Sequence, residues 1–245
     1  MTRARVVLFG ATGRMGRALQ LVLAESAQAA FFGAVGRVVA GGHVATDATG
    51  AATDPKNLLE QADVCIDFTL PETLGTHLDL CTQHRVAYVS GVTGLGDAAQ
   101  DALDHAADTI PLLWAPNMST SVNVCFGAAA DIARRLSGEV SVSIHDIHHA
   151  GKQDAPSGTA LEFGRLIQAT GATLQPIRYT SVRDGRHPGE HHILFESGTD
   201  QIELRHRAGD RREFAVGAVR AASWLIDQSP GRYNMQNVLN ITNSP

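Results

Sequence analysis

The chain has 245 residues, of which 44% are hydrophobic, and a formal net charge of −5. A chain of this length and composition can bury a substantial core, as one large domain or two modest ones. It contains no block of lysine or arginine, which argues against nucleic acid or an anionic membrane surface as a partner. No apolar run approaches membrane-spanning length, so we expect no membrane association.

The cysteine pattern predicts a reducing compartment. Cys65, Cys81 and Cys125 are odd in number and have no CxxC spacing, so buried, reduced thiols are expected and a disulfide framework is not. The first residues lead directly into a short apolar strand without the hydrophobic core of a signal peptide. We therefore expect a cytoplasmic protein.

In the first half of the chain, apolar strands take turns with amphipathic helices. Strands that are apolar throughout indicate a parallel sheet covered on both faces, so we predict an α/β, Rossmann-like, doubly wound fold. Strands are expected at residues 5–9, 29–35, 64–68, 86–90 and 111–114, and helices at residues 14–28, 73–84 and 97–107. A Gly/Ala-rich loop is expected to join the second strand to the third.

The pattern changes after a long helix expected at residues 121–136. Segments 140–147, 177–183, 191–195 and 201–207 alternate polar and apolar residues, which is typical of a sheet with one covered and one exposed face. A helix at 157–169 should pack on this sheet, and a last helix at 213–227 should return to the first domain. We predict a dinucleotide-binding domain at residues 1–119, with a return of about 212–245. A second α+β domain at 120–211 is predicted to bind the substrate and form oligomers.

A glycine turn follows the first strand. Gly10, Gly13 and Gly16 have the spacing GxxGxxG at the place where a dinucleotide pyrophosphate docks on a helix N-terminus, although tight packing alone is the alternative reading. About twenty residues on, where NAD-preferring folds usually have an acid, the chain has Gly36 and Arg37. Arginine without a neighbouring carboxylate suits the 2′-phosphate of NADP. We expect NADPH to be preferred and NADH to be possible.

Polar residues, glycines and prolines also follow three later strands of the first domain. These segments are residues 67–71, 90–94 and 115–119. Each one alone is compatible with an ordinary turn. Because ligands of open α/β sheets bind outside the carboxyl ends of the strands, the three together favour one continuous cofactor crevice.

The most informative segment is His148-His149-Ala150-Gly151-Lys152, followed by Pro156-Ser157-Gly158-Thr159. Adjacent histidines on an extended segment point to opposite faces, so one can contact a ligand while the other packs against the protein and supports the binding site. Ser157 is the expected helix cap, and the amides of Gly158, Thr159 and Ala160 would favour an anion such as carboxylate or phosphate. The chain has only two lysines among twenty cationic residues, so a lysine beside a histidine pair is unexpected by chance.

Two plainer readings of this segment stay open. The histidines could end a strand beside a solvated lysine. The eleven histidines of the chain could also include metal ligands, but no cysteine or HExxH pattern accompanies them and Lys152 would repel a cation. We expect no metal site.

These segments together resemble the 4-hydroxy-tetrahydrodipicolinate (dihydrodipicolinate) reductase family of lysine and diaminopimelate biosynthesis. The resemblance rests on GATGRMG at 10–16, DFT at 67–69 with Pro71, GVTG at 91–94, APN at 115–117 with Val122 and Asn123, and the block 148–160. It runs from the first strand to residues 231–239. It implies an NAD(P)H-dependent oxidoreductase that reduces 4-hydroxy-tetrahydrodipicolinate, a cyclic dicarboxylate, to tetrahydrodipicolinate, and it implies a homotetramer.

The resemblance also implies roles for individual residues. His148 would be the general acid/base, Lys152 the proton donor, and His149, Gly158 and Thr159 would bind the substrate. The cofactor would be lined by Gly10, Ala11, Thr12, Gly13, Arg14, Met15, Arg37, Gly91, Val92, Thr93, Ala115, Pro116, Asn117 and Met118. The residues themselves leave open whether His148 or Lys152 delivers the proton.

The chain departs from the family pattern in places. Family members often carry an acidic residue at the position of Gly36 and a glutamate at the position of Asp146. They often have a glycine where this chain has Ser121 and a phenylalanine where it has Met118. None of these changes removes a candidate catalytic group. The alternative functions are another NADP-dependent amino-acid dehydrogenase of related architecture, which would not need the His-His-Lys block, and a non-catalytic NADP-sensing protein.

Overall fold

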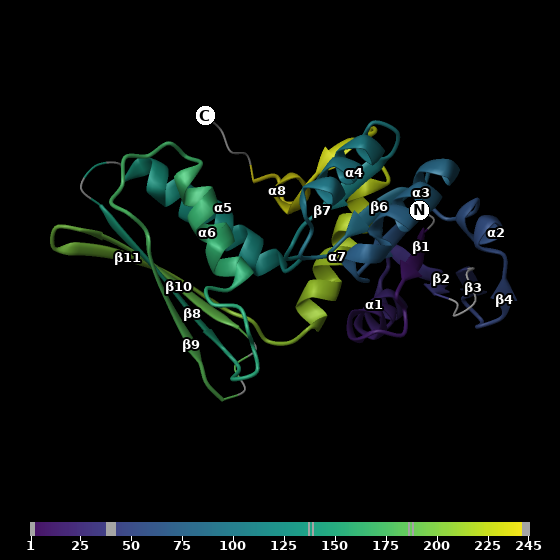
Figure 1. The fold of residues 1–245 in the computed structure, drawn as a ribbon, viewed down its shortest axis with the longest axis horizontal. Coiled ribbons are helices and arrows are strands. Elements are labelled where there is room, and N and C mark those ends of the chain that lie inside the picture. The colour runs from purple at the N-terminus through teal and green to yellow at the C-terminus, as the bar shows by residue number, and fades with distance from the viewer. Residues whose placement is uncertain are drawn as a thin grey trace. The chain divides into compact units, whose positions relative to one another are not determined.

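The computed structural model describes residues 3–37, 43–136, 138, 140–185, 187 and 189–241, with the backbone alone for residues 37, 43 and 44. The described chain divides into two compact units (Figure 1). The first unit comprises the residues up to Ser119 together with Arg211–Asn240, and the second comprises Thr120–Asp210 together with Ile241. Among the described helices, none has the length and apolar character that a membrane crossing requires.

The first unit is built on an eight-stranded sheet with the strand order β12-β7-β6-β5-β1-β2-β3-β4. The strands are β1 (Ala4–Phe9), β2 (Ala29–Arg37), β3 (His43–Asp47), β4 (Ala52–Thr53), β5 (Val64–Asp67), β6 (Ala87–Ser90), β7 (Pro111–Trp114) and β12 (Gly231–Tyr233). All neighbours from β12 to β2 are parallel, whereas β3 and β4 pair antiparallel at the edge. The predicted α/β, Rossmann-like class is confirmed.

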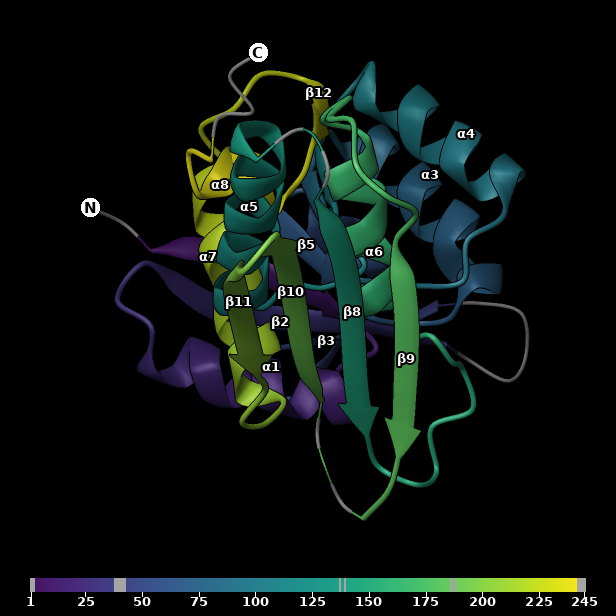
Figure 2. The ribbon, with the colours of Figure 1, turned by 90° about the vertical axis from the view of Figure 1, so that its left-hand side faces the viewer.

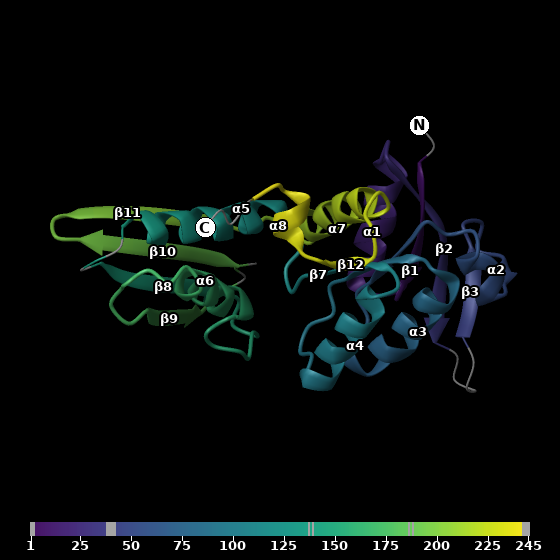
Figure 3. The same ribbon diagram turned by 90° about the horizontal axis from the view of Figure 1, so that it is seen from above.

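Helices cover both faces of this sheet (Figure 3). The helices are α1 (Arg14–Glu25), α2 (Pro55–Leu59), the 3-10 turn η1 (Pro71–Thr73), α3 (Leu74–His84), α4 (Asp97–Ala107), α7 (Arg212–Leu225) and α8 (Met235–Val238). Successive residues of β1 enter opposite cores: Val6 and Leu8 pack with α1 and α7, and Val7 and Phe9 with α3 and α4. Burial on both faces explains why these strands are apolar throughout.

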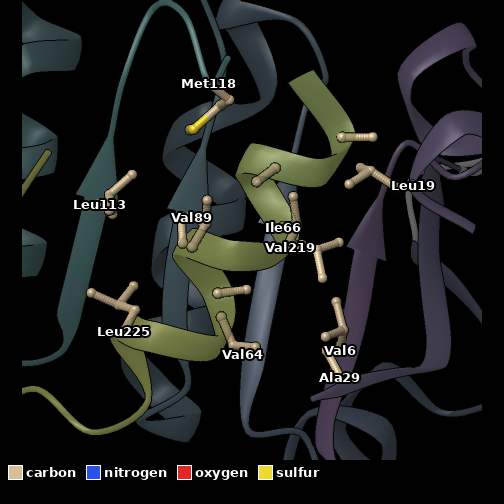
Figure 4. Packing of buried hydrophobic residues seen from close by; sticks show 14 of the residues in the cluster. Val6, Leu19, Ala29, Val64, Ile66, Val89, Leu113, Met118, Val219 and Leu225 are labelled. Atoms are coloured by element: carbon tan, nitrogen blue, oxygen red, sulfur yellow. The ribbon is translucent and has the colours of Figure 1, made fainter. Parts of the chain in front are cut away.

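Helix α7 returns from far along the sequence to the centre of the first core. Figure 4 shows Val219 and Leu225 of α7 beside Val6, Val64 and Val89 of the sheet. Because α7 is rich in alanine, with Ala215, Ala218, Ala221 and Ala222 fully buried, its backbone lies close to the strands. The C-terminal part of the chain thus completes the core that the first strands begin.

The segment between the second and third predicted strands differs from the prediction. The loop predicted there is wrong, because β3, β4 and α2 occupy much of this segment. Asp54 caps α2 by accepting from the backbone of Lys56 at 2.9 Å, and Pro55 takes the first helical position, which are standard helix-start signals. Helix α1 also ends earlier than predicted, because Ser26 Oγ accepts from the backbone N–H groups of Gln28 and Ala29 and turns the chain into β2.

The second unit is a four-stranded sheet with two helices on one face. The elements are α5 (Thr120–Arg135), β8 (Ser141–His148), α6 (Gly158–Gln168), β9 (Arg178–Arg183), β10 (Glu190–Ser197) and β11 (Asp200–Arg207). Figure 2 shows the strands in the order β11-β10-β8-β9. The pairs β11/β10 and β10/β8 are antiparallel, whereas β8 and β9 are parallel.

The alternation predicted for this second sheet is confirmed. Val142 and Ile144 of β8 and Ile193 and Phe195 of β10 point to the helices, and their neighbours in the strands point to the uncovered face. Phe126 of α5 and Phe163 of α6 meet edge-to-face, with ring centroids 4.5 Å apart, over this core. The hydrophobic core of the unit therefore lies between the sheet and the helix pair, and it fixes the direction of every second side chain in β8.

The tight turn before α1 gives a test of the first unit. A Cβ at Gly16 would overlap the backbone of Gly10 and Ala11, so Gly16→Ala should lower the free energy of unfolding by about 1–3 kcal/mol, the usual cost of overpacking. In the control variant Gly75→Ala, the added methyl group meets nothing within 4 Å on α3, and stability should rise by about 0.5–1 kcal/mol. Urea denaturation measures both, and equal stabilities would contradict the close approach at Gly16.

Candidate active site

The carboxyl ends of β1, β5, β6 and β7 meet at one edge of the first sheet. These four strands are adjacent and parallel, so the segments that follow them lie side by side. The Gly91 amide donates to the Asp67 carbonyl at 2.9 Å, and the Ala115 amide donates to the Ser90 carbonyl at 3.1 Å. The three predicted strand exits are therefore linked by backbone hydrogen bonds, at the edge where ligands of open α/β sheets bind.

The glycine turn after β1 fits a dinucleotide pyrophosphate. Gly10 has φ +78°, and a Cβ on it would come within 2.8 Å of the Thr69 side chain. Within residues 10–17, all of which are described, no side chain caps α1 at Gly13 and no acidic residue stands in its first turn. An uncapped helix start that lacks acidic residues suits an anion.

The residues predicted to line the cofactor differ in the solvent exposure of their side chains. Thr12, Arg14, Thr93 and Pro116 are exposed at this edge, and Ala11, Met15, Gly91 and Asn117 are partly buried. Val92, Ala115 and Met118 lie in the cores, so these residues can offer a ligand mainly their backbone. The side chain of Arg37 is outside the part of the chain that the structure describes, as are residues 38–42.

A buried carboxyl group underlies the same edge. Asp67, at the end of β5, is completely buried and accepts hydrogen bonds from Thr69 N at 2.7 Å and Thr69 Oγ1 at 2.6 Å through one oxygen. Its other oxygen lies 2.6 Å from His77 Nδ1 and accepts from the Tyr88 hydroxyl at 2.6 Å. Asp67 thus holds Thr69 beside Gly10. Burial is the main cause that raises the pKa of Tyr88, and Asp67 adds to it, so the phenol stays protonated and donates.

We predict that Asp67 is a stability centre of the first unit. Removing one donor in Tyr88→Phe should cost about 0.5–1.5 kcal/mol, the usual net contribution of a hydrogen bond. Asp67→Ala should cost more, about 3–5 kcal/mol, because it removes the acceptor that three side chains share. Urea denaturation of the two variants gives the order, and an Asp67→Ala protein as stable as Tyr88→Phe would contradict this prediction.

In the second unit, the alternation of β8 places Asp146 and His148 on the same face, towards α6. Asp146 is completely buried and His148 nearly so. The distance from His148 Nδ1 to Asp146 Oδ1 is 2.9 Å. Asp146 also accepts from Arg183 Nη1 at 2.7 Å, Ser181 Oγ at 2.6 Å and the Ser157 amide at 3.3 Å. One carboxylate therefore joins β8, β9 and the start of α6.

His148 lies in a row of buried histidine rings. The ring of His191 on β10 is 5.2 Å from that of His148, and the ring of His206 on β11 is 5.7 Å from that of His191. Burial lowers the pKa of His191 to about 3, with smaller contributions from the charges of His148 and His206, so this ring is neutral at pH 7. Burial also lowers the pKa of His148, assisted by the charges of Lys152 and Arg183 and opposed by Asp146.

The loop between β8 and α6 carries the predicted lysine. The His149 side chain is exposed, while its amide donates to the His187 carbonyl at 2.9 Å. Lys152 Nζ lies 2.8 Å from Asp154 Oδ1, and Arg183 Nη2 donates to the Asp154 carbonyl at 2.5 Å. The loop is thus attached to β9 by the same guanidinium that binds Asp146.

The start of α6 follows the prediction in part. Ser157 is the N-cap, and its hydroxyl accepts from the Ala160 amide at 3.1 Å. Because that amide is already used, the expectation that it would bind an anion is wrong. Gly158 is exposed and Thr159 half-buried in the first turn. The hydrogen bond from Lys152 is the main cause that lowers the pKa of Asp154, and the nearby backbone of Gly158 lowers it further.

The structure therefore brings His148, Lys152, Gly158 and Thr159 together at one end of the second sheet. Arg183 and His191 are parts of this site that were not predicted from the sequence, and Asp146 was predicted only as a shorter acid in the place of a glutamate. The alternation of β8 could have revealed that Asp146 shares a face with His148. No local signal identifies Arg183 and His191, because they come from strands far along the sequence.

One unit has a glycine turn of the phosphate-binding type at the edge of its sheet, and the other unit has a site with histidine and lysine. This combination is typical of a two-domain, dinucleotide-dependent oxidoreductase. Comparison with known proteins gives the family. The model of the dihydrodipicolinate reductase N-terminus matches residues 4–118, and that of the dihydrodipicolinate reductase C-terminus matches residues 121–239. The chain belongs to this family, which uses NAD(P)H, and the resemblance seen in the sequence is confirmed.

Individual relatives are similar to this chain along nearly their whole length. A 4-hydroxy-tetrahydrodipicolinate reductase of Alkalilimnicola ehrlichii is 41% identical over 264 residues, covering 97% of this chain and 99% of that protein. One from Pseudoalteromonas atlantica is 38% identical, with coverage of 97% and 99%. Among solved structures, the dipicolinate-bound dihydrodipicolinate reductase from Paenisporosarcina sp. TG-14 has a TM-score of 0.77 at 21% identity and covers 95% of this chain and 98% of that one.

Proposed function

We propose that the chain reduces 4-hydroxy-tetrahydrodipicolinate to tetrahydrodipicolinate with NAD(P)H, in the biosynthesis of diaminopimelate and lysine. The observation that carries the proposal is the assembly of His148, Lys152 and the start of α6 around the buried Asp146. We assign the cofactor to the first unit and the substrate to the second. The full-length relatives, which are reductases of this substrate, support the same reaction.

The chemistry needs a proton donor beside the substrate ring. When bound, the nicotinamide supplies a hydride. Loss of the hydroxyl group as water leaves a C=C bond conjugated with a C=N bond, and hydride addition at one carbon leaves an electron-rich system that takes a proton at the next. Lys152 and His148 are the groups of the site that can hold and deliver this proton. We assign the delivery to Lys152, because burial lowers the pKa of His148 and so disfavours a protonated imidazole at pH 7.

The substrate carboxylates have a matching place at the start of α6. There the Asp154 carboxylate is paired with Lys152, and the nearby backbone of Gly158 helps to lower its pKa, so the site suits an oxyanion. Asp154 is more than half exposed and can move away without loss of core packing. We propose that a substrate carboxylate takes the place of Asp154 beside Lys152 and binds the amides of Gly158 and Thr159. The exposed ring of His149 would bind the dicarboxylate from the solvent side.

We further propose a cytoplasmic homotetramer formed through the second unit. The uncovered face of its sheet combines apolar Ile147, Val182 and Leu194 with paired charges. Hydrogen bonds lower the pKa of Glu190 to about 2, and the bond from Arg207 has the largest effect. The Glu190 carboxylate is thus paired with side chains of the same face of the sheet. Such a face can pack on another sheet without leaving unpaired charges. Cys65, Cys81 and Cys125, all in the described part of the chain, form no disulfide, which is consistent with a reducing compartment.

Turnover tests the proposed function directly. The wild-type protein should oxidise NADPH when freshly generated 4-hydroxy-tetrahydrodipicolinate is added. His148→Gln and Lys152→Ala should each lower kcat by roughly 10²-fold or more and leave the Kd of NADPH nearly unchanged, because Lys152 as proton donor and His148 as general acid/base act in the chemical step.

The matched controls replace residues of the same type outside the site. Lys56→Ala changes the other lysine of the chain, which lies on α2, and His105→Gln changes an exposed histidine of α4. Both should keep wild-type kcat. Full turnover in Lys152→Ala or His148→Gln would remove these residues from the reaction.

The choice of cofactor follows from Gly36 and Arg37. We propose that NADPH is preferred, because an arginine without a neighbouring carboxylate can pair with the 2′-phosphate but leaves the ribose hydroxyls of NADH without an acceptor. Such a contact is worth about 1.5–3 kcal/mol, so kcat/KM should favour NADPH by about tenfold to a hundredfold. Arg37→Ala should remove most of this preference, whereas Arg220→Ala on α7 should not. Steady-state kinetics with both cofactors decide, and equal kcat/KM values in the wild type would overturn the assignment.

A further inference from the structure

The hydrogen bonds of Asp146 determine which nitrogen of His148 carries a proton. Its carboxylate oxygens accept from the Ser157 amide and from a guanidinium N–H of Arg183, groups that can only donate, and from the hydroxyl of Ser181. Burial alone raises the pKa of Asp146, but these hydrogen bonds, that from Ser181 first, outweigh it and lower the pKa. An ionised carboxylate accepts and cannot donate. The 2.9 Å contact therefore requires a hydrogen on His148 Nδ1.

A neutral imidazole carries one hydrogen. If that hydrogen is on Nδ1, Nε2 has the free lone pair and is the nitrogen that can exchange a proton with a ligand. The backbone beside Nε2 comes from Gly189, which has φ +144°. A Cβ at Gly189 would lie 3.1 Å from Nε2, so the glycine keeps the space next to this atom free of a side chain.

Arg183 connects the same carboxylate to the lysine loop. One of its terminal nitrogens donates to Asp146 Oδ1 and the other to the carbonyl of Asp154, whose side chain pairs with Lys152. The side chain of Arg183 is largely buried, with 16% of it exposed, so it has few alternative positions. A single side chain thus sets the distance between the His148 end of β8 and the Lys152 loop.

We propose that Asp146 and Arg183 are positioning residues of the reaction. Asp146 holds His148 as the Nδ1–H tautomer with Nε2 towards the substrate, and Arg183 fixes both Asp146 and the loop that carries Lys152. The proposal rests on the proposed function for its kinetic consequences. The tautomer of His148 is a property of the resting protein and does not depend on the substrate.

The pH dependence follows from the groups that face His148. These are Asp146 on β8, Arg183 on β9, His191 on β10 with His206 behind it on β11, and Lys152 with Asp154 in the loop. Burial and the positive charges of Lys152 and Arg183 lower the pKa of His148, and His191 is neutral at pH 7. The nearby negative charge of Asp146 acts in the opposite direction and raises the pKa of His148. Removing that charge lowers the pKa of His148, and the limb of the pH–rate profile that His148 produces should move to lower pH.

The first test reads the tautomer in the wild-type protein. Magic-angle-spinning NMR of protein labelled with 15N in histidine distinguishes protonated from bare ring nitrogens, and His148→Gln identifies the signals of His148. Above the pKa of His148, we expect a protonated Nδ1 and a bare Nε2. A protonated Nε2 would overturn the proposal, whether or not the protein turns over the substrate. Absence of turnover with the expected tautomer would instead refute the proposed function alone.

The second test uses variants of Asp146. Asp146→Asn should lower kcat on the order of 10²-fold, since loss of the orienting carboxylate permits the wrong tautomer, and should change the substrate KM less than threefold. The His148 limb of the pH profile should move to lower pH, and the NMR signal of a protonated Nε2 should appear. Asp146→Glu keeps the charge and should recover most of kcat.

Glu162→Gln is the matched control for the loss of a carboxylate. Glu162 is paired with Arg165 on α6 and lies outside the site, so kcat, the pH profile and the tautomer should stay as in the wild type. If Asp146→Asn loses activity but keeps both the pH limb and the tautomer of the wild type, Asp146 has only a structural role and the proposal fails. If Asp146→Asn does not fold, the wild-type tautomer decides alone.

Discussion

The site of the second unit depends on one buried carboxylate. Asp146 has no exposed surface, and burying a charge costs several kcal/mol unless its hydrogen bonds are complete. The chain meets this cost with donors from β9, from the start of α6 and from His148. The elements that supply the donors are thereby fixed relative to one another. The position of His148, the start of α6 and the course of the Lys152 loop are three consequences of the same set of hydrogen bonds.

The first unit also has a buried carboxyl group, at the edge of its sheet where β1, β5, β6 and β7 end. Asp67 is also completely buried at the end of a strand, next to a histidine nitrogen, and holds Thr69 against Gly10 in the turn before α1. In both units, a buried carboxyl group at or near the end of a strand organises the loop that follows. The hydrophobic cores fix the strands, and the buried acids fix the loops, which leaves the exposed loop residues available for ligands.

Local patterns in the sequence predicted most of the fold. Helix α4 and strand β7 were predicted at their observed bounds, because an amphipathic helix and a short apolar strand with clear ends depend little on distant contacts. Strands β3 and β4 were missed, since these short edge strands of mixed composition are defined by their pairing with β2. In the site, the sequence located the histidine pair, Lys152 and the cap Ser157. Arg183 and His191 could not be predicted, because strand pairing brings them to His148 from 35 and 43 positions further along the chain (183 − 148 and 191 − 148).

The most direct test of this account is a crystal structure of the protein with dipicolinate, a stable analogue of the cyclic dicarboxylate substrate. We predict that one carboxylate of the ligand accepts hydrogen bonds from the amides of Gly158 and Thr159 in place of Asp154, that Lys152 contacts the ligand, and that Nε2 of His148 faces the ring while Nδ1 stays on Asp146. Dipicolinate bound away from α6, or His148 turned so that Nδ1 faces the ligand, would contradict the account.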